Sequence, residues 1–331
     1  MGSIGGAILP AMKKTVFLAA ITLILCLTLP AVADTVILPH RVIDTRTMTV
    51  IDFEGLLARC SEARVVTLGE NHDDPATHMI ELAVLEGLLR VHGDVVFSME
   101  MFERDVQDVL DSYLAGEITE EEFLADSRPW GNYATDYRPS VEFARDHGIP
   151  VIASNVPRYL AGQVAQSGFA NADFPDEAAG LYATTFEAPE DGYWEAFAAT
   201  MMMPGMEAMG VTVETIRLYY EAQVIKDETM AESVTMAAEA DPDAVVYHIA
   251  GAFHLADYLG TFSRIRRNMP AADCVSILVV PVDDLLAPLP EDTSMADYWI
   301  LVIAPEEETG EMPPMPPAAE AEESVTEPDS E

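Results

Sequence analysis

The chain has 331 residues, of which 57 are Asp or Glu and 17 are Lys or Arg, so its formal net charge at pH 7 is −40. Nucleic acid is excluded as an expected partner because phosphate binding requires a basic footprint. Half of the residues are hydrophobic, which fits a globular body preceded by an apolar leader. Because the chain is so acidic, an anionic ligand would have to be held by local arginines.

The first 33 residues have the pattern of an export signal. Two lysines at 13–14 precede the apolar run 15–29, and residues 31–33 form a small-x-small cleavage site. We therefore expect a mature chain that starts at Asp34 and is secreted, periplasmic or associated with the outer membrane. The run is short for a membrane span, and a lipid anchor at Cys26 is not preferred because a large residue precedes it.

The body of the chain alternates short β-branched runs with amphipathic helical segments. A helix is expected to begin at Asp74-Pro75, with Asp as the N-cap and Pro in the first turn. Repeated strand–helix–strand order predicts an α/β fold whose central sheet is mainly parallel and flanked by helices. The expected strands cover residues 64–68, 94–99, 150–153, 244–249, 274–282 and 298–303.

Two further segments complete the expected organisation of a single α/β domain over residues 34–304. Residues 176–241 are largely helical, with one long stretch over 213–239, and we expect them to form a cap over the site. Five methionines lie between Met201 and Met209, and packing or an apolar ligand wall is favoured over metal ligation for them. Residues 305–331 contain ten Asp or Glu and no Lys or Arg, which predicts a disordered acidic, Pro-rich tail.

The motif Gly-x-x-His occurs twice, as Gly69 to His72 and as Gly251 to His254, each time directly after an expected strand. One copy alone would be explained by a glycine that serves a turn. Glu100 ends another strand, and Arg158 follows a fourth. Because the carboxyl ends of parallel strands share one edge of a sheet, where open α/β folds bind ligands, these residues predict a single site.

These segments together resemble the ChaN-like haem-binding uptake proteins, which are grouped with the Tiki and TraB proteins and are distantly similar to erythromycin esterases. The resemblance covers about 65–280. It implies an exported bacterial factor for iron acquisition that binds haem in a pocket, sometimes shared between two protomers, so that a homodimer and an outer-membrane uptake system are possible partners. The residues that carry it lie at 68–73, 98–102, 133–139, 151–158, 227–231 and 250–254.

Haem binding is the favoured function. A porphyrin needs an apolar slot, an axial ligand for iron and a cationic group for its propionates. The candidate axial ligands are His72, His254, Tyr133 and Tyr137, and Arg158 is the candidate propionate partner. Ordinary aromatic packing is the plainer role for either tyrosine.

The alternative is a metal-dependent hydrolase, which the wider superfamily also implies. His72, Glu100 and His254 would hold a divalent ion, Glu70 would accept a proton and Arg158 would stabilise an oxyanion. No tight ligand spacing such as His-Glu-x-x-His supports it. A third hypothesis is that Glu70, Glu100 and Arg158 form a buried ion network that only orders the edge of the sheet.

The remaining Cys and His residues point to structural roles. Cys60 and Cys274 could pair in an oxidising compartment or serve as small buried hydrophobic residues. His248 lies within an expected strand, which favours a hydrogen-bonded core histidine. His78 falls on the first helix, and nothing in the sequence assigns it a function.

Overall fold

The computed structural model describes residue 2 and residues 38–202, 211–289 and 296–305. Residues from His40 onward form a compact unit distinct from residues 1–39. The predicted leader, most of the methionine cluster and nearly all of the predicted acidic tail lie outside the described residues. Those three interpretations therefore stay predictions.

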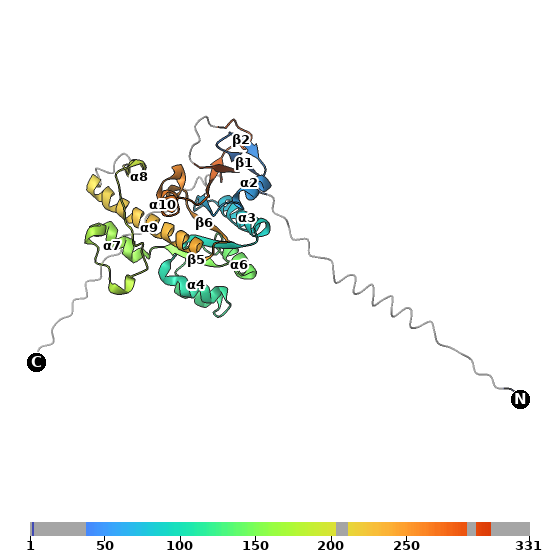
Figure 1. Ribbon diagram of the computed structural model, residues 1–331, viewed down its shortest axis with the longest axis horizontal. Coiled ribbons are helices and arrows are strands. Elements are labelled where there is room, and N and C mark those ends of the chain that lie inside the picture. The colour runs from blue at the N-terminus through green and yellow to red at the C-terminus, as the bar shows by residue number, and fades with distance from the viewer. Residues whose placement is uncertain (1, 3–37, 203–210, 290–295, 306–331) are drawn as a thin grey trace, which may run out of the picture. The chain divides into compact units, whose positions relative to one another are not determined.

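An eight-stranded sheet forms the centre of the fold (Figure 1). Its order is β2-β1-β8-β7-β3-β6-β4-β5. Neighbours from β8 to β5 pair in parallel, whereas β1 is antiparallel to both β2 and β8. The strands are β1 His40–Asp44, β2 Thr49–Ile51, β3 Val65–Glu70, β4 Val95–Glu103, β5 Val151–Asn155, β6 Val245–Gly251, β7 Cys274–Val282 and β8 Tyr298–Ile303.

The predicted α/β fold with a mainly parallel sheet is confirmed. All six strands predicted from β-branched runs are present, while β1 and β2, which extend one edge, were not anticipated. β3 lies between β6 and β7, and β6 lies between β3 and β4. The register pairs Glu70 with Gly251, so both Gly-x-x-His motifs leave the sheet side by side.

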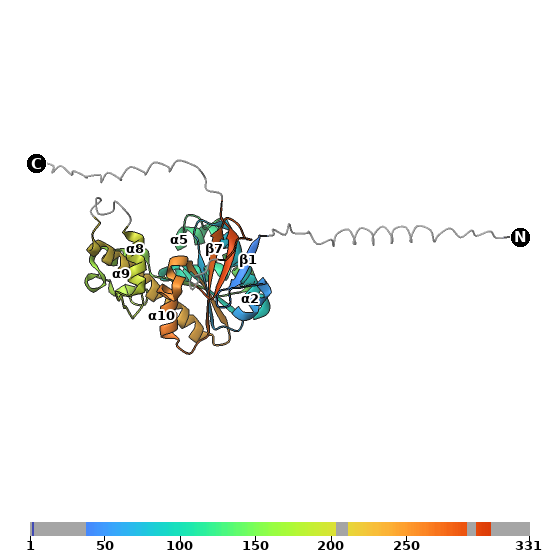
Figure 2. The ribbon, with the colours of Figure 1, turned by 90° about the horizontal axis from the view of Figure 1, so that it is seen from above.

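Helices cover both faces of the sheet. α3 packs on α2 and α6 and against β3, β4 and β6, whereas α9 packs on α7 and α10 and against β4, β5 and β6. Figure 2 shows α2 and α10 on opposite sides of the sheet. The helices are α2 Phe53–Cys60, α3 Pro75–Val91, α4 Gln107–Leu114, α5 Glu120–Ser127, α6 Arg138–His147, α7 Arg158–Ser167, α8 Gly192–Met201, α9 Val213–Ala240 and α10 Gly260–Asn268.

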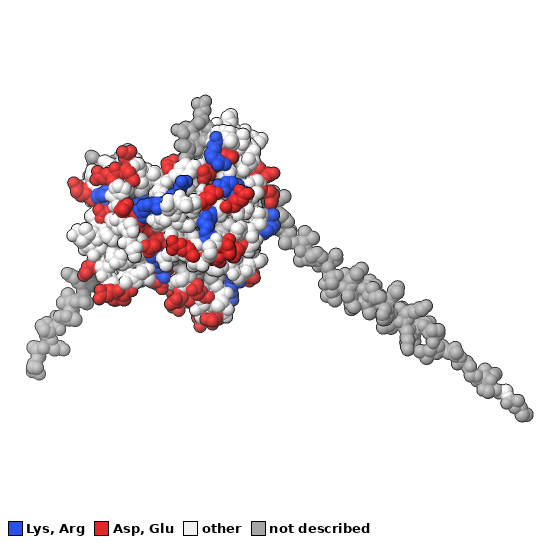
Figure 3. Space-filling view, viewed as in Figure 1, with Lys and Arg blue, Asp and Glu red and all other residues white. Residues whose placement is uncertain are grey.

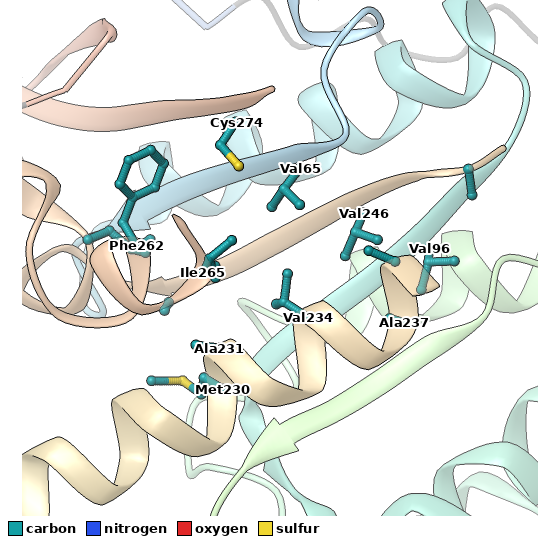
Figure 4. Close-up of a cluster of buried hydrophobic side chains, with 14 residues drawn as sticks. Val65, Val96, Met230, Ala231, Val234, Ala237, Val246, Phe262, Ile265 and Cys274 are labelled. Atoms are coloured by element: carbon teal, nitrogen blue, oxygen red, sulfur yellow. The ribbon is translucent and has the colours of Figure 1, made fainter. Parts of the chain in front are cut away.

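The main core lies between α9, α10 and the sheet. In Figure 4, Val234 of α9 points toward Val65 and Val246 of the central strands, and Met230 of α9 and Ile265 of α10 belong to the same cluster. These residues are essentially inaccessible to solvent. Each buried aliphatic side chain of this kind contributes about 1.5–3 kcal/mol through removal from water, so α9 is fixed firmly along its C-terminal half.

The predicted cap region contains α8 and the N-terminal half of α9. Asp191 caps α8 by accepting from the Tyr193 and Trp194 amides, and Thr212 caps α9 by accepting from the Thr215 amide. α9 is one continuous helix that runs from the predicted cap region to the sheet, and a cap over the site stays a prediction.

Among the charged side chains on the face shown in Figure 3, the acidic ones are more widespread than Lys and Arg. Among the described residues, no helix combines the length and the apolar character that crossing a membrane requires. Cys60 on α2 and Cys274 on β7 are both buried and unpaired. The structure therefore has them as buried free thiols and not as a disulfide.

Candidate functional site

A pocket of about 820 Å³ opens at the carboxyl edge of β3, β4, β5 and β6. Five of the residues singled out from the sequence line it, namely Glu70, His72, Glu100, Arg158 and His254. Its volume falls within the range of about 300–1,000 Å³ typical of small-molecule sites. The strand ends therefore bring the predicted residues to one concave surface.

The two Gly-x-x-His motifs pack against one another, which explains their glycines. A Cβ atom on Gly251 would lie 2.8 Å from Nε2 of His72 and 3.6 Å from Oε2 of Glu100. A Cβ atom on Gly69 would lie 2.4 Å from Leu278 Cδ2 and 3.1 Å from the Cα atom of Ala252. The glycine of each motif therefore leaves room for a residue of the other motif, His72 beside Gly251 and Ala252 beside Gly69.

His72 is held through one ring nitrogen and exposed through the rest of its ring. Its Nδ1 makes a short hydrogen bond to Oε1 of Glu70, and its side chain is 44% exposed. The hydroxyl of Tyr137 donates to the same carboxylate oxygen over 2.8 Å. The bond to Glu70 raises the pKa of His72, partly offset by burial. Nε2 of His72 lies next to Gly251, and His72 is on the lining of the pocket.

His254 is enclosed between two carboxylates. Its Nδ1 lies 2.7 Å from Oδ1 of Asp227, and its Nε2 lies 3.3 Å from Oε1 of Glu100. Burial lowers the pKa of His254, but the charges of Glu100 and Asp227 outweigh it and raise that pKa to about 10. Burial alone would raise the pKa of Glu100, yet His254 and the Gly251 N–H lower it strongly. His254 is therefore an imidazolium at neutral pH, with both N–H groups occupied.

Two partners of His254, Asp227 and Gln223, come from α9 and were missed by the sequence analysis. Asp227 is fully buried and also accepts from the hydroxyls of Thr261 and Tyr193. The amide of Gln223 lies 3.2 Å from Nε2 of His254. Asp227 opens one of the segments that carry the family resemblance, which was the available signal, but helical periodicity alone did not single it out.

Aromatic and aliphatic groups form much of the remaining pocket wall. Trp130 lies edge-on to His72 with 5.0 Å between ring centroids. Phe197 and Met201 come from α8, and Phe253 comes from the second Gly-x-x-His motif. Met201 is the member of the methionine cluster that reaches the pocket among the described residues, and this position fits the expected apolar ligand wall.

Two cations stand on the pocket lining. Arg158 begins α7, its side chain is 78% exposed, and its Nε lies 3.8 Å from Glu103. Lys226 of α9 is half-buried, and it is the one lysine that follows residue 14. Arg158 is too exposed to act as a buried ion-pair partner, but it remains free to meet an anionic group at the mouth of the pocket.

The two candidate tyrosines lie behind the pocket instead of on its lining. Tyr133 and Tyr137 are both buried. Burial raises the pKa of each hydroxyl, and for Tyr137 the charge of Glu70 adds to this effect. A tyrosine that ligates iron does so as the anion, which these environments disfavour.

A second ionisable cluster lies behind Glu70. His78 of α3 places Nδ1 3.0 Å from Oε2 of Glu81 and 3.7 Å from Oε2 of Glu70. Burial, followed by the charge of Glu70, raises the pKa of Glu81 well above its usual value. Within the described ranges, this trio is the one set of three or more metal-ligating side chains whose ligand atoms all lie within 4.8 Å of one another. The predicted set of His72, Glu100 and His254 is not such a set.

His248 has the core position expected of it. It is fully buried, and its Nδ1 lies 2.9 Å from the Ser98 hydroxyl. Burial lowers its pKa to about 4, so it stays neutral at physiological pH.

Comparison with known proteins gives a family and a fold. The model of the haem-binding uptake family of the Tiki superfamily, ChaN, matches residues 56–265. ChaN of Campylobacter jejuni, solved with cofacially bound haem, is 16% identical, and the match covers 80% of this chain and 97% of that one with a TM-score of 0.58. A mutant of the erythromycin esterase EreC in its open conformation is 14% identical over 80% and 83% of the two chains, with a TM-score of 0.44. No curated protein matches the chain.

Proposed function

Because the chain belongs to the haem-binding uptake (ChaN) family of the Tiki superfamily, we propose that it binds haem in the pocket at the carboxyl edge of the sheet and serves the uptake of haem iron. The observation that carries the proposal is His72. One of its nitrogens is fixed by a buried carboxylate, and the residue is on the lining of an open pocket with aromatic walls.

His72 has the arrangement of an imidazole metal ligand. Protein ligands of this type donate one ring N–H to a carboxylate, which fixes the tautomer and increases the basicity of the other nitrogen. Glu70 is that carboxylate, and Tyr137 fixes it in turn. His72 is therefore assigned as the axial ligand, and bound haem would supply the iron to be carried.

The rest of the pocket suits the other parts of a porphyrin. Trp130, Phe197 and Phe253 offer flat apolar contacts for the ring. Arg158 and Lys226 stand on the lining and supply positive charge for the two propionates. The same lining carries five acidic residues, namely Glu70, Asp73, Asp74, Glu100 and Glu103, so Arg158 and Lys226 are the groups that would have to meet the propionates.

The hydrolase alternative has less support from the geometry. Nδ1 of His254 lies 2.7 Å from Asp227 and its Nε2 lies 3.3 Å from Glu100, so both ring nitrogens already have carboxylate partners. The predicted metal set of His72, Glu100 and His254 would therefore require His254 to lose its proton and one of its partners. We assign the His254 group a structural role, as the anchor between α9 and the strand ends.

Export, and delivery to or from an outer-membrane uptake system, belong to the same proposal. Their support is the leader pattern in residues 1–33 and the family's role in uptake. A homodimer that shares haem between protomers stays a prediction. Light scattering of the purified protein with and without haem measures it directly.

The central test is a haem titration of wild-type protein, His72→Ala and His147→Ala, followed by absorbance. His147 is an exposed histidine on α6 whose Nδ1 bonds to the Phe143 carbonyl, away from the pocket. Wild type and His147→Ala should give the same saturable Soret band, and His72→Ala should shift the band and weaken binding. An unchanged band in His72→Ala would remove His72 as the ligand, and no saturable binding by wild type would remove the function.

A further inference from the structure

The cluster of Glu70, His78 and Glu81 is buried behind the pocket and is not used by the proposed haem site except through Glu70. Glu70 and Glu81 are 2% and 1% exposed. Among the residues that the structure describes, neither carboxylate has an ion pair with Arg or Lys. Two carboxylates without a cation are costly in such a place, because burial penalises the charged form.

The hydrogen bonds of His78 fix which of its nitrogens carries a proton. Nε2 lies 3.0 Å from the carbonyl oxygen of His72. A carbonyl oxygen only accepts, so Nε2 must donate its N–H. In the neutral imidazole the lone pair is then on Nδ1, and that atom faces Glu81 Oε2 at 3.0 Å and Glu70 Oε2 at 3.7 Å. If all three groups are deprotonated, three electron-pair donors face one another, so a proton or a cation has to lie between them.

Two carboxylate oxygens in the cluster lack a hydrogen-bond donor. Oε2 of Glu70 and Oε1 of Glu81 are buried atoms without a partner. Buried polar atoms are satisfied in the great majority of folded proteins, so each orphan atom marks a missing proton, water or ion. Here both orphan atoms belong to the same cluster as the Nδ1 lone pair, and a single cation between them would satisfy all of these groups together.

We propose that Glu70, His78 and Glu81 bind one first-row divalent metal ion, at a site separate from the haem pocket. Two carboxylates balance the charge of the ion, and an imidazole with two carboxylates suits Zn²⁺, Fe²⁺ or Mn²⁺. With metal–ligand bonds of about 2.0–2.2 Å, neighbouring ligand atoms are separated by about 3.0–3.6 Å. The separations of 3.0 and 3.7 Å from His78 Nδ1 are close to this range.

The surroundings of the site also fit a bound ion. Asp136 lies 3.6 Å from Nε2 of His78, where it reinforces the His72 carbonyl as a partner of that N–H. The hydroxyl of Tyr247 donates to the backbone carbonyl of Glu81, which fixes that turn of α3. Glu70 offers Oε2 to the ion while Oε1 keeps its bonds to His72 and Tyr137, so one carboxylate would serve both sites.

The test uses the purified full chain, stripped with a chelator and titrated with Zn²⁺ in a calorimeter, with the metal content measured after gel filtration. Wild type should bind one Zn²⁺, and Glu81→Gln should weaken binding at least about tenfold, since it removes a ligand charge and keeps the shape. Glu86→Gln, the same change at an exposed position on the same helix, should bind as wild type does. His78→Gln provides a second ligand variant, should Glu81→Gln prove unstable.

The outcomes separate this site from the haem pocket. His72→Ala should still bind Zn²⁺, and Glu81→Gln should still bind haem. The proposal is overturned if wild type binds no Zn²⁺, which would leave a shared proton as the occupant of the cluster. It is also overturned if Zn²⁺ is lost in His72→Ala and kept in Glu81→Gln, which would place the ion in the pocket. Neither of these results would alter the haem titration of wild type.

Discussion

Gly251→Ala should disable the pocket while leaving the fold intact, because the added Cβ meets the tip of a side chain. The Cβ would lie 2.8 Å from Nε2 and 2.9 Å from Cε1 of His72. Ordinary contact begins near 3.5 Å, so the ring has to move by about 0.7 Å. The ring is 44% exposed and can swing outward, but this breaks its bond to Glu70.

The expected loss follows from that bond. A hydrogen bond to a charged group contributes about 1.5–3 kcal/mol, which corresponds to about a 10- to 100-fold weaker haem affinity if His72 is the ligand. The free energy of unfolding should change by less than about 2 kcal/mol, because the backbone of Gly251, at φ −50° and ψ 137°, is accessible to alanine.

The assay pairs a haem titration with urea unfolding for Gly251→Ala, Gly69→Ala and Gly162→Ala. A Cβ added to Gly69 would clash with the buried side chain of Leu278, so alanine there should cost about 1–3 kcal/mol of stability. Gly162 on α7 has no atom within 4 Å of the added Cβ and is the matched control. Wild-type haem affinity in a folded Gly251→Ala protein would refute the reasoning.

Three further predictions concern charge and stability. The folded pKa of His254 is raised from 6.5 to about 10, so its contribution to stability, about 5 kcal/mol, is complete below pH 6.5 and is lost as the pH rises through 10. Urea unfolding at pH 6.5 and at pH 10 should therefore show a fall in the free energy of unfolding that His254→Gln removes, and an equal fall in the variant would contradict this. Burial raises the pKa of Cys60 to about 12 and of Cys274 to about 11, so iodoacetamide at pH 8 should modify neither until the protein is unfolded, as peptide mass analysis would reveal. Glu228→Ala removes the carboxylate that lies 3.1 Å from the buried guanidinium of Arg264. It should destabilise the protein by about 3 kcal/mol or more. A thermal midpoint equal to that of wild type would show that stability does not depend on this ion pair.

The sheet and its functional edge could be predicted from the sequence because both depend on local patterns. Buried parallel strands are nearly continuous β-branched runs, and each run ends where a polar residue leaves the sheet. His72, Glu100 and His254 follow from strand ends alone. β1 and β2 could not be found in this way, since they are short and carry exposed positions along an antiparallel edge.

The partners of these residues could not be predicted, because they depend on how helices pack. Asp227 is one of many acidic residues on α9, and only the position of that helix over β6 brings it to His254. His78 looked like an ordinary helical residue, yet α3 directs it beneath Glu70. Conversely, Tyr133 and Tyr137 share the expected region of the fold but point into the core.

α9 contributes side chains both to the pocket and to the main core of the fold. At 1.5 Å per residue its 28 residues span about 42 Å without a break. Gln223 and Lys226 line the pocket from the middle of the helix, and Met230 to Ala238 pack in the main core. The helix that packs in the main core therefore also fixes the positions of Gln223 and Lys226, so these two side chains reach the pocket from a rigid support.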